Sequence, residues 1–386
     1  MTYNKKIKNF FKLLFVCLMF FSSIPLSAST EELDNFEPGP FIIDHVLDSY
    51  GWHIITYKGH DVSIPLPIIL FDHGKPVCFM SGKFHHGHDA YKGYALGFTE
   101  NTKNKIVKLK GEYAGYTGHI TEEMIPAIDS EAKILDISIT KNVCSLFISI
   151  ILICWIFIYI SRRYKANPCK APKGLQSILE VVILFVRDEI ARPSIGEAKY
   201  NKYLPYLLTL FFFILINNIM GLVPIFPGGA NLTGNIAVTA TLALITFMVT
   251  LFSSTKNYWK HIFNTPGVPW WLKIPIPIMP IVEFVGVITK PLVLMIRLFA
   301  NITGGHIIIL GFVSLIFIFG QMTPVAGFGV SVVSLIFYLF MGMLELIVAF
   351  VQAFVFTLLS ALYIGMALDD GHHEEKHVAL ASEECS

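Results

Sequence analysis

Five long apolar segments constrain this chain more than any other feature of its sequence. About 20 consecutive apolar residues are enough to cross the hydrocarbon core of a bilayer as a helix, which satisfies its own backbone groups there. With 54% hydrophobic and only 15% charged residues among 386, the sequence predicts an all-α polytopic membrane protein. The net charge of +1 gives no reason to expect a nucleic-acid partner. The predicted crossings are Val143 to Ile160, Tyr203 to Val223, Asn235 to Phe252, Pro275 to Phe319 and Val330 to Ala367.

The last two segments are longer than one straight crossing requires. A helix of this length inside a bilayer must tilt strongly or bend. Proline and paired glycines are the usual sites of bends, so we expect any bend at Pro291 or at Gly304-Gly305.

The charges between the segments predict the orientation of the chain. Arg162, Arg163 and Lys165 follow the first segment, and Lys256 and Lys260 follow the third. Because basic loops mark the cytoplasmic side, both connections are predicted inside, and five crossings place the N-terminal region outside and the C-terminus inside. The predicted outer loops, which carry no charge, are Pro224 to Thr233 and Gly320 to Gly329.

A shorter segment, Gly174 to Ile190, mixes apolar with charged residues, among them Glu180 and Arg187. Charges at both depths favour an interfacial amphipathic helix on the inner side. A weak additional membrane span is the alternative.

The N-terminus has the pattern of a secretory signal peptide over residues 1–29. Lysines precede an apolar core, Leu13 to Phe21, and Ser27-Ala28-Ser29 offers small residues for cleavage. An uncleaved first membrane helix is the alternative. We expect residues 30–141 outside, 142–368 as the membrane domain and 369–386 as a cytoplasmic tail.

Residues 30–141 are polar, with short β-type runs such as Trp52 to Tyr57 and Val62 to Ile68, broken by Gly and Pro. They predict a small β-rich extracytoplasmic region. Three clustered histidines, His85, His86 and His88, form a weak candidate for a metal site, since clustered imidazoles bind zinc or copper. Histidines of a surface loop without any ligand are the favoured interpretation. The six cysteines lack CxxC spacing and indicate neither a zinc site nor a disulfide framework.

A charged stripe runs along the fourth apolar segment. Glu283, Lys290 and Arg297 are spaced by seven and lie on one helix face, with Asn301 four residues further on the same face. A guanidinium stays charged, and its placement at mid-bilayer costs about 3 kcal/mol on insertion scales. Snorkelling to an interface is the alternative for Glu283 and Lys290, but apolar residues extend well beyond Arg297 on both sides. Arg297 is therefore predicted to meet a partner.

The last segment carries a second polar stripe, Glu345, Gln352 and Tyr363. A buried carboxyl without a partner tends to stay protonated, a property suited to passing protons. His306 on the preceding segment is its predicted partner, because an imidazole both accepts and donates at neutral pH. Taken singly, each of these polar residues could equally make only a packing hydrogen bond.

Two other functions fit parts of this pattern. A secondary transporter would use a bent helix at mid-membrane, but it predicts an internal repeat that the sequence does not show. An intramembrane metalloenzyme would use His306 and Glu345, but there is no HExxH motif and no evident third ligand.

Several motifs resemble subunit a of F-type ATP synthases. The most specific are Arg297-Leu298-Phe299-Ala300-Asn301, with Lys290-Pro291 before it and Gly304-Gly305-His306 after it, and the run Glu345 to Phe356. The resemblance includes Asn218 to Pro224 and, more weakly, Gly174 to Glu180, and it extends over residues 143–368.

This resemblance implies a non-catalytic stator channel of a rotary machine in the bacterial inner membrane, with no cofactor. The implied partners are the proteolipid c-ring, each of whose subunits has one membrane carboxylate, the peripheral-stalk b subunits, and lipid. Arg297 would face the ring between two half-channels. The external half-channel would be lined by Asn301, His306, Glu345 and Gln352, with Asn218 near its mouth. Glu283 would lie toward the internal one, and Tyr363 matches a tyrosine of the last helix.

Two positions depart from the pattern of some family members. Those members have an acid where His306 stands and a histidine where Glu345 stands, so this chain keeps one acid and one imidazole in the reverse arrangement. Some have an acid at the position of Gly221, so the external path is expected to be built slightly differently here. Residues 30–141 have no counterpart in the resemblance.

Overall fold

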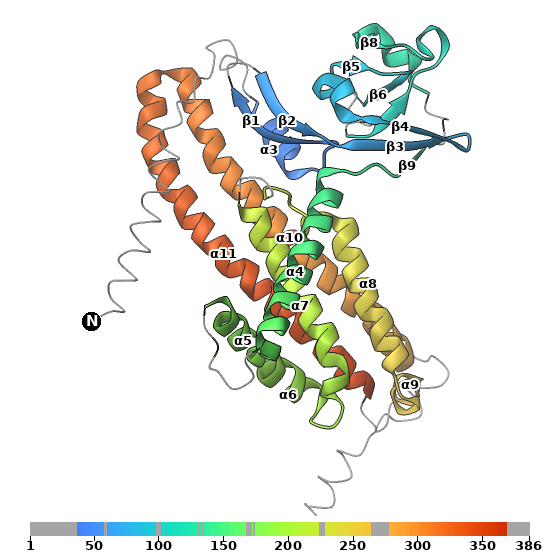
Figure 1. Ribbon diagram of the computed structural model, residues 1–386, viewed down its shortest axis with the longest axis vertical. Coiled ribbons are helices and arrows are strands. Elements are labelled where there is room, and N and C mark those ends of the chain that lie inside the picture. Colours follow the sequence, from blue (N-terminus) through green and yellow to red (C-terminus); the bar gives the residue numbers. More distant parts are fainter. Residues whose placement is uncertain are drawn as a thin grey trace, which may run out of the picture.

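The computed structural model describes residues 37–368 apart from short gaps at 58–59, 98–101, 103, 130–131, 133, 167–171, 173, 224–227 and 264–277. Strands gather at one end of a set of long helices (Figure 1). The predicted signal peptide, 1–29, and the predicted tail, 369–386, lie outside the described residues.

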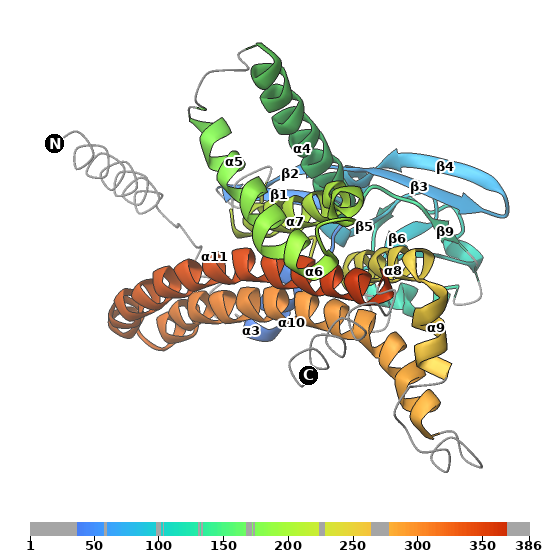
Figure 2. The ribbon, with the colours of Figure 1, turned by 90° about the horizontal axis from the view of Figure 1, so that it is seen from below.

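Five of the described helices are long and apolar enough to cross a membrane, as the sequence predicted. They are α4 (Lys141–Ala166), α7 (Tyr200–Leu222), α8 (Ile236–Ser253), α10 (Ile278–Met322) and α11 (Pro324–Leu368). α10 and α11 run antiparallel as a hairpin (Figures 1 and 2). α7 and α8 pack on the half of this hairpin that lies away from the turn between α10 and α11.

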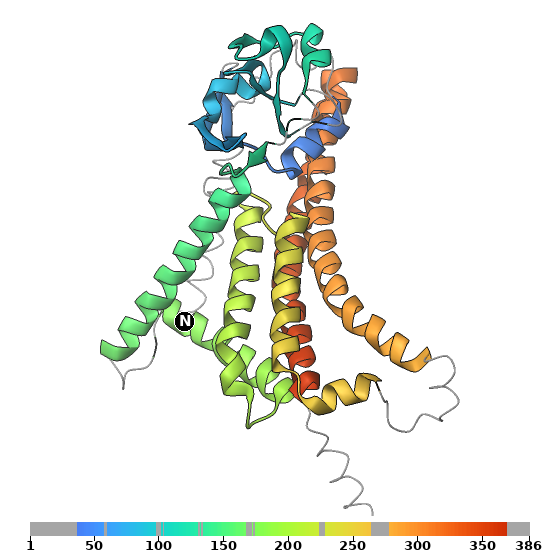
Figure 3. The same ribbon diagram turned by 90° about the vertical axis from the view of Figure 1, so that its right-hand side faces the viewer.

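α10 is one continuous helix of 45 residues, and neither Pro291 nor Gly304-Gly305 interrupts it. At 1.5 Å per residue it is about 68 Å long, more than twice the ~30 Å of a hydrocarbon core. Figure 3 shows α10 curving along its length, with its N-terminal end directed away from the other helices, so the helix bends without being interrupted.

The predicted outer loop Gly320 to Gly329 is wrong, because only Thr323 separates α10 from α11. The Thr323 hydroxyl accepts a hydrogen bond from the Ala326 amide at 3.2 Å, and Pro324 begins the new helix. A Thr–Pro pair of this kind starts helices efficiently. Gly327 lies so close to Gly320 that a Cβ on it would come within 2.9 Å of the Gly320 Cα, so the two helices meet without a loop.

The membrane core is formed by buried residues of α7, α10 and α11 and of the stretch 186–195 that precedes α7. Within it, α7 packs against α11 and against that stretch. Its largest fully buried side chains include Phe211, Phe212 and Phe356. α4 packs on α7, where the rings of Phe157 and Phe212 meet edge to face at 5.0 Å. The other side of α4 is exposed and apolar, as expected of a lipid-facing surface, with Ile151 and Trp155 more than 60% exposed.

The segment predicted as an interfacial helix is α5 (Leu175–Phe185), which continues into a π-helical stretch, η4 (Val186–Ala191), and α6 (Arg192–Ile195). Arg187 and Arg192 both pair with Asp188, and the Arg192 guanidinium lies over the Tyr200 ring at 5.2 Å. At Gly365 of α11 a Cβ would come within 1.9 Å of the Ser194 carbonyl oxygen, so only glycine lets α6 lie this close to α11. A short helix, α9 (Lys256–Phe263), follows α8.

The N-terminal region begins with α3 (Pro38–Val46) and then forms small antiparallel sheets. The predicted run Val62 to Ile68 is divided at Leu66, because flanking prolines have no amide hydrogen for a continuous ladder. Two clusters of buried side chains, one around Ile68, Leu70 and Phe84 and one around Val107 and Leu109, form its core. The strands are β1 (Gly51–Tyr57), β2 (His60–Pro65), β3 (Pro67–Asp72), β4 (Lys75–Met80), β5 (Asp89–Ala90), β6 (Tyr94–Leu96), β7 (Ile106–Lys108), β8 (Gly118–His119) and β9 (Leu135–Asp136), with 3₁₀ turns η1 (Ser81–Gly87), η2 (Gly111–Tyr113) and η3 (Glu122–Ala127).

Candidate functional site

The structure brings His306 and Glu345 together, as the sequence predicted. The His306 Nδ1 atom of α10 lies 2.7 Å from the Glu345 Oε1 atom of α11. The Glu345 side chain is only 3% exposed, and neither of its oxygens makes a hydrogen bond of good geometry with the described residues. A buried carboxyl oxygen left open beside an imidazole is suited to binding a proton or a water molecule.

Gly305 makes this approach possible. A Cβ at Gly305 would lie 2.9 Å from the Glu345 Oε1 atom and 3.0 Å from its carboxyl carbon. The neighbouring Gly304 has open space on that side. The first glycine of the pair is therefore free of this constraint, whereas the second is required by packing against Glu345.

A second polar bridge joins the same two helices. The Asn301 side-chain amide donates to the Gln352 Oε1 atom at 2.8 Å. Gln352 is buried, and its own amide nitrogen has no partner among the described residues. Asn301 of the first predicted stripe therefore meets Gln352 of the second, and His306, which is not part of the first stripe, meets Glu345.

α7 adds a third contact, and it distinguishes two adjacent asparagines. The Asn218 amide donates to the Ala349 carbonyl of α11 at 3.3 Å, and its Oδ1 atom accepts from the Thr233 hydroxyl at 2.7 Å. Asn217 instead donates to Phe213 of its own helix. Sequence reasoning missed Thr233, which lies in an uncharged loop with no motif to mark it.

Gly221 lies beside His306 from the α7 side. A Cβ at Gly221 would be 3.5 Å from the His306 Nε2 atom and 3.5 Å from the Ala230 carbonyl oxygen. The position at which some relatives were expected to have an acid is thus in contact distance of the His306–Glu345 pair.

Arg297 is exposed on the surface of α10. Among the residues that the structure describes, no carboxylate lies within ion-pair distance of it. A guanidinium in apolar surroundings is costly unless it meets an opposite charge.

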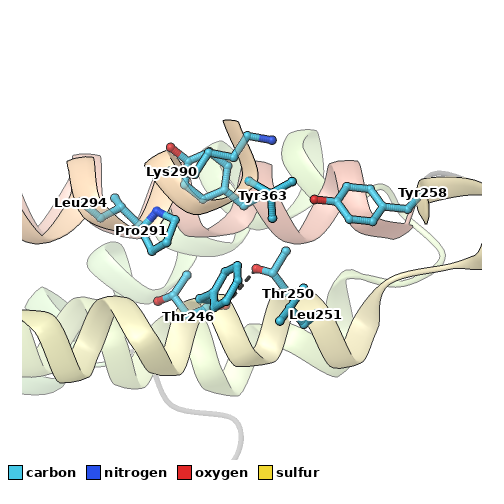
Figure 4. Close-up of a pocket in the computed structure, with 10 residues that line it drawn as sticks. Thr246, Thr250, Leu251, Tyr258, Lys290, Pro291, Leu294 and Tyr363 are labelled. Atoms are coloured by element: carbon cyan, nitrogen blue, oxygen red, sulfur yellow. Dashed lines mark hydrogen bonds between the residues drawn. The ribbon is translucent and has the colours of Figure 1, made fainter. Parts of the chain in front are cut away.

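A small cavity lies on the other side of Arg297, between α8, α9, α10 and α11 (Figure 4). The Lys290 ammonium lies over the Tyr363 ring, 5.5 Å from its centre. Glu283 is half-buried, and its carboxylate is near enough for its negative charge to act on both Lys290 and Tyr258. The polar residues that line the cavity are Thr246, Thr250, Tyr258, Lys290 and Tyr363.

Three of those lining residues, Thr246, Thr250 and Tyr258, were not singled out from the sequence. A signal was present, since Thr239, Thr246 and Thr250 recur at helical spacing in an apolar segment and all three are buried. Tyr258 had no signal, because it sits in a short helix outside the apolar segments.

Two histidines of the N-terminal region approach the same carboxylate. The His85 Nδ1 atom contacts the Asp89 Oδ2 atom, and the His119 Nδ1 atom lies 3.6 Å from the Asp89 Oδ1 atom and donates to the His88 carbonyl oxygen at 2.7 Å. No group of three His, Cys, Asp or Glu side chains in the described part of the chain is arranged to hold a metal ion. The side chain of His86 lies outside that part.

Two family models match this chain. Residues 143–365 match the family described as ATP synthase A chain, and residues 41–137 match a domain of unknown function, DUF8433. Curated relatives agree with the first match. An ATP synthase subunit a from Chloroherpeton thalassium is 41% identical over 250 residues, covering 63% of this chain and 70% of the relative. One from Myxococcus xanthus is 43% identical over 250 residues, covering 63% and 77%.

The family model covers more than half of the chain, and it covers all of the site residues described above. The same segment holds all five apolar helices. The chain therefore belongs to the ATP synthase A chain family, as a non-catalytic, proton-translocating stator subunit of the ATP synthase complex.

Proposed function

We propose that Arg297 faces the carboxylates of a proteolipid c-ring and separates two half-channels. The observation that carries this proposal is the contrast on α10: Arg297 is exposed and lacks an acidic partner within the described chain, while His306 contacts α11. A cation on an apolar surface fits a ring of membrane carboxylates supplied by another subunit.

The electrostatics supports a barrier at Arg297. At an effective dielectric constant near 20, a charge pair about 4 Å apart gains about 4 kcal/mol. That energy corresponds to a pKa change of about 3 units, which keeps a facing ring carboxylate ionised. Its proton therefore cannot slip directly across, whereas the neutral, protonated carboxyl can travel through lipid. Each proton moved gains about 2.3 kcal/mol per 100 mV, which drives rotation in one direction.

The external half-channel in this proposal runs past Asn218 to the His306–Glu345 pair, with Asn301 and Gln352 between that pair and Arg297. The contacts among α7, α10 and α11 support this order, and the open polar atoms of Glu345 and Gln352 lie along it. Thr233 joins the path through its hydrogen bond to Asn218.

The internal half-channel in this proposal is the cavity beside Lys290 and Tyr363. It lies on the N-terminal side of Arg297 along α10, opposite to His306. Glu283 lies seven residues before Lys290 on α10, where protons leave toward the inner solution. Tyr258 of α9 also lines the cavity.

Orientation and location follow from the basic residues. Arg162, Arg163 and Lys165 are exposed at the end of α4 that lies away from the strands, and α9 with Lys256 and Lys260 is at the same end (Figure 3). Helix ends and loops rich in lysine and arginine tend to stay on the cytoplasmic side of a membrane. In this proposal the N-terminal region therefore lies outside a bacterial inner membrane.

The chain divides accordingly into four parts in this proposal: a signal peptide (1–29), an extracytoplasmic N-terminal region (30–141), a membrane domain (142–368) and a cytoplasmic tail (369–386). The two family matches, 41–137 and 143–365, support the boundary near residue 141. The peripheral-stalk b subunits are the further proposed partner.

The test is Arg297→Ala in the whole synthase. We expect the variant chain to insert and assemble, while ATP-driven acidification of inverted membrane vesicles is abolished. Arg162→Ala, a change of an exposed arginine at the inner end of α4, is the matched control and should pump normally. Normal acidification by the Arg297 variant would remove the assigned role.

A further inference from the structure

The N-terminal region has no part in the proton path described above, yet it is bound to the membrane helices at two separate places. One is its own continuation into α4 and the other is α3 lying on α10. The role of these two attachments goes beyond the proposed function and rests on it only for the ring that turns against α10 and α11.

The connection to α4 is held throughout by backbone hydrogen bonds. The amides of Ile137 and Ile139 donate to β3 carbonyls at 3.0 and 3.1 Å, and the Lys141 amide donates to the Ser49 carbonyl at 2.8 Å. The Asp48 carboxylate accepts from the Asn142 amide at 3.0 Å, which caps the first turn of α4 from another element. The region is therefore attached to α4 without a free linker.

The second attachment lies on the opposite side of the bundle. α3 packs against α10, where the rings of Phe41 and Phe317 are 6.3 Å apart. Phe317 is five residues from the end of α10, close to the turn into α11. Figure 3 shows α4 and α10 diverging from each other, with α3 and the strands bridging their outer ends.

The part of the hairpin that α3 reaches has little other support. Thr303 contacts the Gly234 carbonyl just before α8, and His306 lies beside Gly221 at the end of α7. The 16 residues from Ile307 to Met322 thus extend about 24 Å beyond those helices. Among the described side chains from Thr303 to Leu344, only Ser314, Gly327 and Ser334 are buried.

We propose that residues 37–141 act as a brace that ties the outer end of the α10–α11 hairpin to α4. A ring turning against the hairpin pushes it sideways, and a helix without lateral packing yields to such a force. Because α10 is continuous, a displacement at Phe317 is transmitted to His306 and Arg297. The brace holds these residues in register with the ring carboxylates. Because residues 37–141 join α4 to α10, the outer end of the α10–α11 hairpin is attached to a second helix and is not free to move by itself.

The first experiment joins the two halves of the contact. Phe41→Cys and Phe317→Cys are combined in the full synthase, and a short bifunctional thiol reagent links them in inverted vesicles. We expect efficient linking and undiminished ATP-driven pumping, because a brace does not move during turnover. Each single-cysteine variant is the control for reaction with native cysteines such as Cys144. Failure to link, or loss of pumping after linking, would overturn the brace; the second result would identify α3 as a moving lid.

The second experiment breaks the contact. Phe41→Asp should lower the ratio of pumped protons to hydrolysed ATP several-fold, since a loose hairpin leaks. Ile43→Asp places the same charge on an exposed position of the same helix and should leave that ratio unchanged. If the charged variant does not assemble, Phe41→Ala serves in its place. An unchanged ratio would refute the proposal, and it would leave the result at Arg297 untouched.

Discussion

Glu345 and Arg297 are both costly in a membrane, and the structure deals with them in opposite ways. Glu345 is buried and paired with His306 inside the chain, whereas Arg297 is exposed and has no acidic partner among the described residues. A buried acid beside an imidazole can pass a proton between the two groups, since neither the neutral pair nor the ion pair leaves an isolated charge. The permanent charge of a guanidinium suits a fixed barrier.

The pair predicts that its members can exchange places. Glu345→Gln, which removes the acid, should slow passive proton flux through the membrane sector without lowering the amount of assembled complex. Exchanging both residues, by Glu345→His with His306→Glu, keeps one acid and one imidazole at a 2.7 Å contact and should recover much of the flux. The measurement is proton flux into vesicles stripped of the catalytic sector. A double variant as slow as the worse single variant would contradict the pairing.

At the scale of elements, the site depends on how closely α10 and α11 approach. The two hairpin helices approach closely at glycines, among them Gly320 and Gly327, and Gly305 lies against the Glu345 carboxyl. Close packing leaves no room for an added methyl group here without displacing Glu345.

Gly305→Ala should therefore reduce proton flux by moving the Glu345 carboxyl away from His306. Overpacking of this kind also costs stability, by about 1–3 kcal/mol. Gly311→Ala is the matched control, because Gly311 lies on the same helix with open space around it. Flux assays of the two variants decide the matter, and equal flux would show that the close contact is dispensable.

The sequence was sufficient for the helices but not for every contact between them. Apolar length predicted all five crossings, and seven-residue spacing predicted both polar stripes. Spacing along one helix cannot show which neighbour a side chain meets, so nothing distinguished Asn218, which bonds to α11, from Asn217, which bonds to its own helix. In place of the predicted loop Gly320 to Gly329 there is only a turn at Thr323, because the glycines on both sides of it let the two helices pack closely.

As a whole, the molecule joins a region of strands to a set of long apolar helices. In the proposed orientation the strands lie outside, where protons accumulate, and this region must stay folded there. Within it Asp72 pairs with Lys108 and also accepts a hydrogen bond from the Tyr94 hydroxyl at 2.8 Å. The Lys108 ammonium beside Asp72 lowers the pKa of that carboxyl, and burial raises the pKa of Tyr94 to about 12.

The direction of the Asp72 shift fixes the pH dependence. Since its pKa is lower in the folded state than the ordinary value of 3.8, the stabilisation is complete above that value and is lost as the pH falls through the folded-state pKa. Asp72→Asn should weaken protection from hydrogen exchange in β3 and β7 at neutral pH by about 1–2 kcal/mol. Lys75→Ala, at an exposed position on the next strand, is the control. Equal protection in the Asp72 variant and the native chain would contradict this role.

The exposed guanidinium has one more consequence, for the cell that makes this chain. A copy synthesised in excess of its ring leaves an unneutralised cation in contact with lipid, at a cost of about 3 kcal/mol or more. A chain that carries such a cost is less stable and spends more time unfolded, and cellular proteases degrade unfolded chains. We therefore expect solitary copies to be short-lived and the abundance of this chain to follow that of the proteolipid.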